Sequence, residues 1–358
     1  MLDFMKYLKK WSLMLAFSLA MLGGTAVYAA APFDEGWLEL LRQEAIQKGV
    51  TEKTAREVLR NLTPMDKFPK TTTEQAEFKE TLAHYMQKRM PEDMIRQSAE
   101  LLLQYEAELH EIEKTYGVPG QYIMAIWAIE TRLGKNMGNE NVIASLVTLA
   151  RDHPNKDKRE EFRQYLIDAL KLVDKGYSEV LGNGSWAGAM GQPQFMPTSI
   201  MKFGVDLNRD GKVDIWNDKR EIFASIANHL QRKRADAPWH THERVHREVK
   251  VPRGLNPGLF TKLLKEKSQK SKTSREWGKL GLTQSDGTPL PDDDTMQAIL
   301  IAPDGLPGPT FLAYNNFISI MGYNSAYLYA LTVSKGADAI ADRAAALRAS
   351  ANPVPRMN

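Results

Sequence analysis

The chain has 358 residues, of which 43% are hydrophobic and 25% charged, a composition typical of a soluble globular protein with two or three domains. The formal net charge is only +3. A nucleic-acid binder usually has a concentrated excess of basic residues, so we expect no nucleic-acid partner. The absence of cysteine excludes disulfides, thiolate metal sites, a cysteine nucleophile and a lipid anchor on an N-terminal cysteine.

The N-terminus carries the pattern of an export signal. Lysines within residues 6–10 precede an apolar run over about 11–27, and alanines follow at 29–31. This order predicts a secretory signal peptide over 1–29, cleaved close to its end. The alternative is an uncleaved membrane anchor, because about 17 apolar-rich residues are near the lower limit for a span. With either outcome we expect the rest of the chain to be exported.

Residues 33–175 read mostly as helices, with Thr51 as the cap of one helix and Pro91 as the first residue of another. Capped or amphipathic segments predict helices at about 37–45, 52–62, 91–115, 141–151 and 158–175.

Another predicted helix, over 122–133, carries a single acid on an apolar face. Pro119 suits its start and Gly134 suits its end. Apolar residues three, four and seven positions before Glu130 share its face. A carboxyl group in such surroundings is costly to ionise, so we expect a raised pKa and a proton available to a general acid. The alternative is a helix end whose glutamate faces solvent or pairs with Arg132.

A glycine-rich loop follows at 182–191, without the ending of a phosphate-binding loop. Thr198 or Ser199 is predicted to cap the next short helix.

The stretch Asp206–Asp214 has the spacing of an EF-hand calcium loop, with oxygen-bearing side chains at positions 1, 3, 5 and 9 and glycine at position 6. The usual acid at position 12 is absent, so Asp218 or Glu221 would have to close the site. The alternative is an Asp/Asn/Gly turn that holds no ion. The other predicted ligands are Asp206, Asn208, Asp210 and Lys212, the last through its carbonyl oxygen.

Residues 238–305 are richer in proline and glycine, and alternating segments at Arg244–Val251 and Gln297–Ile301 predict strands. Three histidines near the start of this region could share a metal, although a solvated polar face is the simpler interpretation. They are His240, His242 and His246. From Thr310 to Ala346 the chain is predicted to be helical again. Tyrosines at 323, 327 and 329 form either an aromatic core or a wall for sugar rings.

Together these stretches resemble the membrane-bound lytic murein transglycosylase B family, a class of glycosidase-like enzymes with a lysozyme-like core. Ile129-Glu130-Thr131 stands where that family carries its catalytic glutamate, and the longest shared signature runs from Gly184 to Ser199. The stretch Val205–Trp216 resembles its calcium loop. The similarity covers about residues 33–345.

The resemblance implies a mainly α fold, namely a lysozyme-like α core with an EF-hand-like loop, flanking helices and a small β-containing insertion. The expected parts are the signal peptide (1–29), N-terminal helices with the catalytic core (32–237), the insertion (238–305), a C-terminal helical return that completes the cleft (306–346) and a polar tail (347–358).

The resemblance also implies roles for individual residues. Glu130 would be the catalytic group, and Glu221 would close the calcium site because one residue is inserted in the loop. Gln192-Pro193 departs from what many relatives carry. The implied substrate-binding residues are Ser185, Gln194, Tyr323 and Tyr329.

The implied activity is cleavage of the β-1,4 bond between N-acetylmuramic acid (MurNAc) and N-acetylglucosamine (GlcNAc) in peptidoglycan. The reaction would leave 1,6-anhydro-MurNAc ends. Calcium would be structural, and no organic cofactor is expected. We expect a monomer in the periplasm that acts on glycan strands, with wall-synthesis proteins of the envelope as further partners. A muramidase that uses water, or a non-catalytic wall-binding scaffold, would be compatible with the same stretches.

Overall fold

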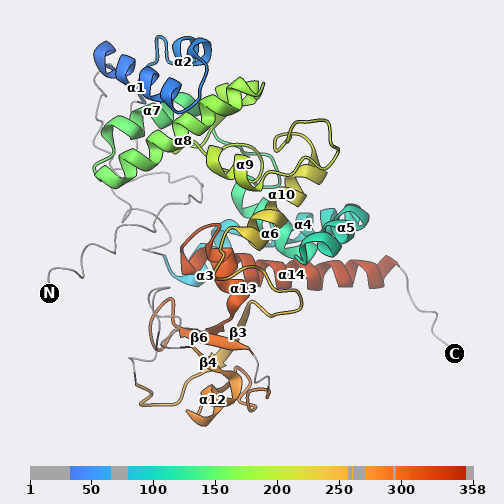
Figure 1. Ribbon diagram of the computed structural model, residues 1–358. Helices are drawn as coiled ribbons and strands as arrows, with labels where there is room; N and C mark the ends of the chain where they lie inside the picture. Colours follow the sequence, from blue (N-terminus) through green and yellow to red (C-terminus); the bar gives the residue numbers. More distant parts are fainter. Residues whose placement is uncertain (1–32, 66–79, 257–259, 261–270, 293–295, 352–358) are drawn as a thin grey trace. The chain divides into compact units, whose positions relative to one another are not determined.

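The computed structural model describes residues 33–65, 80–256, 260, 271–292 and 296–351. Over these residues the fold is mainly helical with two small sheets, which confirms the predicted fold class (Figure 1). The predicted signal peptide and residues 352–358 of the predicted polar tail lie outside the described residues. Within the described part, no helix combines the length and apolar character needed to cross a membrane.

Contacts within the chain define two compact units, Met1–Gln75 with Glu130–Ser225, and Ala76–Ile129 with Ile226–Asn358. The chain passes from one unit to the other inside helices α6 (Gly120–Thr131) and α10 (Lys219–Arg232). The division into parts expected from the sequence stays a prediction.

The first unit is built around two helices that pack on each other, α7 (Val142–Asp152) and α8 (Lys156–Asp174) (Figure 1). The side chains of Asn141 and Asn155 cap these helices by accepting main-chain N–H groups, and Thr51 caps α2 as predicted. Its other elements are α1 (Glu35–Gln47), α2 (Glu52–Val58), β1 (Glu140–Asn141), the 3-10 helix η3 (Ser178–Leu181), β2 (Asn183–Gly184) and α9 (Pro197–Phe203).

Two predictions in these helical regions need correction. The helix α9 begins at Pro197, which has the fixed φ that suits a first position, so neither Thr198 nor Ser199 is its cap. The single helix predicted over 91–115 is instead two, which meet at Tyr105. The bend between them brings two leucines, Leu102 and Leu109, against Gly120, which has no side chain to displace them. The two helices are α4 (Glu92–Gln104) and α5 (Glu106–Tyr116).

The second unit contains a long helix, α14 (Tyr327–Ala351), which packs against α3 (Leu82–Arg89) and α4. A shorter helix, α13 (Asn315–Met321), precedes it and also contacts it.

The same unit contains an antiparallel sheet of five strands in the order β4-β6-β7-β3-β5. It confirms the strands predicted near 244–251 and 297–301. It corrects the start of the C-terminal helical region, because the fully buried run Thr310–Ala313 is a strand, and a short apolar run has no periodicity that separates strand from helix. The elements here are β3 (His246–Lys250), β4 (Lys272–Thr273), α12 (Ser274–Lys279), β5 (Thr283–Gln284), β6 (Gln297–Ile301) and β7 (Thr310–Ala313).

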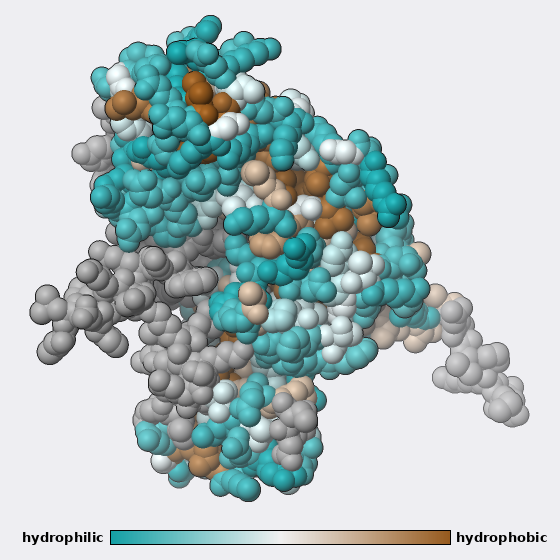
Figure 2. Space-filling view, viewed as in Figure 1, coloured by the Kyte–Doolittle hydropathy of each residue, from teal (hydrophilic) through white to brown (hydrophobic). Residues whose placement is uncertain are grey.

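Hydrophilic residues cover most of the described surface seen in Figure 2, with hydrophobic patches between them. The exposed large hydrophobic side chains are spread along the chain, at Leu40, Leu181, Met201, Leu280 and Leu306. Isolated apolar residues of this kind are ordinary on the surface of a globular protein.

Candidate active site

Glu130 is the second-last residue of helix α6, which ends at Thr131. No side chain from Ile123 to Thr131 is more than 4% exposed, and Glu130 itself is 4% exposed. A glutamate that faces solvent, one of the two alternatives considered from the sequence, is therefore excluded. The acid instead lies at the end of a helix that is almost entirely apolar, where ionisation is costly. Its catalytic role stays a prediction.

The helix ends in a sharp turn made by three residues in the left-handed backbone region, Arg132, Leu133 and Gly134. The hydroxyl of Thr131 accepts the main-chain N–H of Gly134 at 3.1 Å and donates to the carbonyl oxygen of Gln192 at 2.9 Å. The residue next to Glu130 thus closes the turn and joins it to the glycine-rich loop.

Ser185 lies inside this glycine-rich loop and is fully buried. Its hydroxyl accepts the main-chain N–H of Ala189 at 2.9 Å, and its own N–H donates to the carbonyl oxygen of Ala189 at 2.8 Å. Gly188, with φ of +84°, allows the chain to reverse between them. The Ser185 hydroxyl therefore holds the loop in shape, and a direct contact with substrate stays a prediction.

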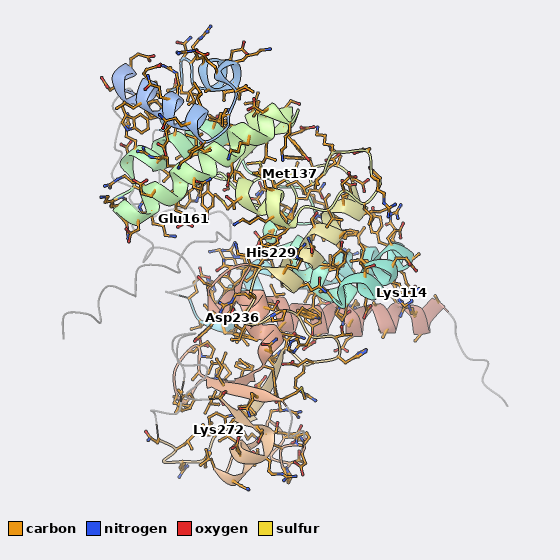
Figure 3. The ribbon with its side chains drawn as sticks, viewed as in Figure 1. Lys114, Met137, Glu161, His229, Asp236 and Lys272 are labelled. Atoms are coloured by element: carbon orange, nitrogen blue, oxygen red, sulfur yellow. The ribbon has the colours of Figure 1, made fainter. Side chains whose placement is uncertain are left out.

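Gln194 joins the same loop to the segment that follows α6. Its side-chain amide donates to the carbonyl oxygen of Gly191 at 2.9 Å and to that of Met137 at 3.1 Å (Met137 is labelled in Figure 3). The two segments also pair as strands β1 and β2, in which Glu140 lies opposite Gly184. The structure thus brings together the surroundings of Glu130, Ser185 and Gln194 in one unit.

Tyr323 and Tyr329 lie together in the other unit, with stacked rings whose centroids are 6.4 Å apart. The ring of His229, on α10, lies 4.6 Å from that of Tyr323 (His229 is labelled in Figure 3). All three side chains are buried, which agrees with the interpretation of the tyrosines as part of an aromatic core. Their binding of sugar rings stays a prediction. Burial, reinforced by Lys233, lowers the pKa of His229 well below its usual value, so its ring is neutral.

The side chains of the predicted calcium loop bind the main chain of the same loop. Asp206 accepts the main-chain N–H groups of Asp210 and Gly211 at 3.1 and 2.9 Å, and Asn208 accepts that of Asp210 at 2.8 Å. Gly211 has φ of +91°, which explains the glycine at position 6. The ammonium group of Lys212 donates to the carboxylate of Glu179 at 2.8 Å. This contact joins the loop to the 3-10 helix η3.

Glu221 enters this loop from the first turn of α10 and is fully buried. Its carboxylate accepts main-chain N–H groups of Leu207, Asn208 and Asp214 at 2.9, 3.2 and 2.6 Å. Asp218 does not enter the loop in this way, because it accepts the N–H groups of Arg220 and Glu221 at the start of α10.

The fit of this loop to calcium is therefore incomplete. The oxygens of Asp206 and Glu221 are engaged with main-chain donors, and nowhere in the described residues do three or more acidic or histidine side chains form a group that could hold a metal. The histidines near residue 240 do not form one either, since His240 binds Glu243 and His246 binds Ser334.

With this geometry established, comparison with known proteins defines the class. The chain matches the family described as "Transglycosylase SLT domain" over residues 33–338. It therefore belongs to this family, which confirms the resemblance seen in the sequence.

Individual relatives agree with this assignment. Membrane-bound lytic murein transglycosylase B of Escherichia coli strain K12 is 29% identical over 261 residues, 72% of this chain. The aligned region spans 66% of that relative, just under two thirds of its length. The crystal structure of SltB3 from Pseudomonas aeruginosa in complex with NAG-anhNAM-pentapeptide has a TM-score of 0.74 and 32% identity, over 86% of this chain and 79% of that one. Escherichia coli lytic transglycosylase Slt35 in complex with calcium has a TM-score of 0.69 and 25% identity, over 86% and 93%.

Two residues beside Glu130 received no role from the sequence, namely Thr131 and Gln192. Thr131 directly follows Glu130 in the chain. Gln192 was noted only as a departure from relatives, and its hydrogen bonds join segments far apart in the sequence, which no local pattern predicts.

Proposed function

We propose that this protein is a lytic transglycosylase that cleaves the MurNAc–GlcNAc bond of peptidoglycan and leaves 1,6-anhydro-MurNAc ends. The observation that carries the proposal is the family match over residues 33–338, within which a buried glutamate ends an apolar helix. The relative SltB3 binds a fragment with an anhydro sugar, which is the kind of end that this reaction leaves.

In the proposed mechanism Glu130 acts first as an acid and then as a base. Its carboxyl group donates a proton to the oxygen that links MurNAc to GlcNAc, and the N-acetyl group of the substrate assists departure of the leaving sugar. The resulting carboxylate then accepts the proton of the MurNAc 6-hydroxyl, whose oxygen closes on the anomeric carbon. The two proton transfers balance, and no water is consumed.

The burial of Glu130 suits this sequence of steps. A carboxyl group in apolar surroundings holds its proton more readily than one in water, as the first step requires. An apolar environment also limits access of water, which would otherwise compete with the 6-hydroxyl and give a reducing end.

The remaining residues have supporting roles in the proposal. Ser185 and Gln194 shape the loop beside Glu130, and Tyr323 and Tyr329 would pack against sugar rings. Calcium, which Slt35 holds in its crystal structure, would stabilise the loop through Asp206, Asn208, Asp210, Lys212 and Glu221 and take no part in the chemistry. We place the protein in the periplasm as an exported monomer.

The decisive experiment digests purified peptidoglycan with residues 30–358 and identifies the released muropeptides by mass spectrometry. Wild type is expected to release anhydro ends, and Glu130→Gln, which has no proton of carboxyl acidity, is expected to release at least a thousandfold less. Glu160→Gln, an exposed change on α8, is the matched control and should match wild type.

Each other result has a definite meaning. Reducing ends released by the wild-type protein would mean that it is a hydrolytic muramidase and not a transglycosylase. Undiminished cleavage by Glu130→Gln would refute the catalytic assignment. Binding of glycan strands without any release would indicate a scaffold.

A further inference from the structure

Gln192 lies between the candidate calcium loop and the end of helix α6. Its side chain is 5% exposed, and its amide donates to the carbonyl oxygen of Trp216 at 2.6 Å. Its main-chain N–H donates to the carbonyl oxygen of Ile215 at 2.9 Å. Main chain and side chain thus both bind the two residues that directly follow the Asp206–Asp214 loop.

The opposite side of Gln192 meets the turn at the end of α6. Its carbonyl oxygen accepts the hydroxyl of Thr131, the neighbour of Glu130. Its side-chain oxygen packs over Gly134, so closely that a Cβ on this glycine would lie 2.4 Å away. The turn therefore has room for Gln192 only because residue 134 has no side chain.

The loop on the other side is fixed to the same point. The carboxylate of Asp214 accepts the main-chain N–H of Trp216 at 2.9 Å, and the N–H of Asp214 donates to Glu221 at 2.6 Å. A continuous chain of hydrogen bonds therefore runs from Glu221 through Asp214 and Trp216 to Gln192 and on to Thr131.

We propose that Gln192 is a positioning residue that couples the order of the Asp206–Asp214 loop to the placement of the Glu130 carboxyl group. This proposal rests on the function proposed for Glu130. A general acid must lie within hydrogen-bond reach of the atom that it protonates, and a displacement of about 1 Å can lower a rate roughly a hundredfold. Buried hydrogen bonds restrict such a displacement, because they hold their donors and acceptors in a fixed arrangement.

The first test is Gln192→Met, which keeps the length of the side chain and removes the amide that binds Trp216. We expect kcat for peptidoglycan to fall about ten- to hundredfold while KM changes less than threefold. Gln43→Met, the same change at an exposed position on α1, is the control and should leave both constants unchanged. A purely structural role would lower the melting temperature without this separation of kcat from KM, and that result would overturn the proposal.

A second pair of variants tests the contact on the other side of Gln192. Thr131→Val removes the hydroxyl that binds the Gln192 carbonyl oxygen and should lower kcat similarly, whereas Thr131→Ser retains that hydroxyl and should restore most of the rate. Equal losses in the two variants would overturn the proposal.

Coupling to the loop is tested by combining substitutions. Asp206→Asn loosens the loop and should lower kcat in the wild-type background, but should add little in the Gln192→Met background if both act through one path. Losses that multiply independently would show that the loop acts elsewhere and would overturn the coupling.

A measurement without substrate separates this proposal from the proposed function. Hydrogen–deuterium exchange of the peptide over residues 131–138 should accelerate in Gln192→Met and in Asp206→Asn, but not in Gln43→Met. Unchanged exchange would overturn the proposal even in an active enzyme. Accelerated exchange in a protein that releases no muropeptides would leave the coupling in place and refute only the transglycosylase assignment.

Discussion

The carboxylate of Glu221 accepts the main-chain N–H of Asp214 at 2.6 Å, across the loop for which the sequence predicts a calcium site. The same carboxylate accepts two further N–H groups at the other end of the loop, from Leu207 and Asn208. One buried side chain on α10 therefore joins both ends of the loop. Main-chain donors can stabilise a buried negative charge without an ion, so this arrangement can hold the loop closed by itself.

The first prediction concerns Glu221→Gln, which removes the charge and directs a side-chain N–H₂ toward main-chain donors. We expect the free energy of unfolding to fall by about 2–4 kcal/mol, because buried donors lose their acceptor. Urea denaturation measures the change, with Glu160→Gln on the surface of α8 as a control expected within about 0.5 kcal/mol of wild type. Equal stability of the two variants would contradict this role of Glu221.

The second prediction concerns calcium itself. If the folded loop binds calcium, the melting temperature will rise with added calcium and fall after chelation. At a free calcium concentration of a hundred times Kd, the free energy of unfolding should rise by about 2.7 kcal/mol. Asp206→Asn should abolish that rise, because it removes the charge of the first predicted ligand. Identical melting in millimolar calcium and in chelator would mean that main-chain bonds alone close the loop.

The third prediction concerns the docking of the segment after α6. Gly138 has φ of +98°, and a Cβ built on it would lie 2.0 Å from the carbonyl oxygen of Gly184. Gly138→Ala must therefore separate β1 from β2, and we expect a loss of about 3 kcal/mol or more with impaired activity.

Gly176→Ala is the matched control for this substitution. Gly176 has a similar φ of +88° but nothing within 4 Å of a built Cβ, so only backbone strain of about 1 kcal/mol is expected. Urea denaturation gives the loss in free energy of unfolding for each variant, and the difference between the two losses is the cost of the steric clash at Gly138. A loss no larger for Gly138→Ala would mean that the two segments are not held together as described.

The sequence predicts those parts of the fold whose signals are local. Thr51 as a cap, Gly134 in the turn that follows α6 and Gly211 in the predicted calcium loop each depend on backbone conformations that a few neighbouring residues determine. Glu130 could be singled out because apolar residues of its own helix share its face.

The errors occur where the structure depends on distant contacts. The helices that meet at Tyr105 place Leu102 and Leu109 against Gly120, and the strand Thr310–Ala313 pairs with β3 and β6. Likewise, no spacing rule connects Gln192 to Thr131, because 61 residues separate them. Local patterns therefore identified the candidate acid but not the residues that fix its position.

The last prediction concerns acid stability of the second unit. His246 on β3 is largely buried, lies 2.5 Å from the hydroxyl of Ser334 through its Nδ1, and packs edge-on against Phe311. Burial, with Lys335 and Arg244 nearby, lowers its pKa from 6.5 to about 4. The unfolded chain therefore binds a proton at this residue below about pH 6.5, whereas the folded protein does so only near pH 4. Because the unfolded state binds more protons in this interval, stability falls as the pH is lowered through it.

The full loss attributable to His246 is about 3 kcal/mol at 1.36 kcal/mol per pH unit, complete near pH 4. His246→Gln should be less stable than wild type at pH 7, since packing is lost, but its stability should change less between pH 6.5 and pH 4. Urea denaturation at several pH values measures this slope, with His84→Gln at an exposed position on α3 as the control. An unchanged slope in His246→Gln would assign the acid sensitivity to other groups.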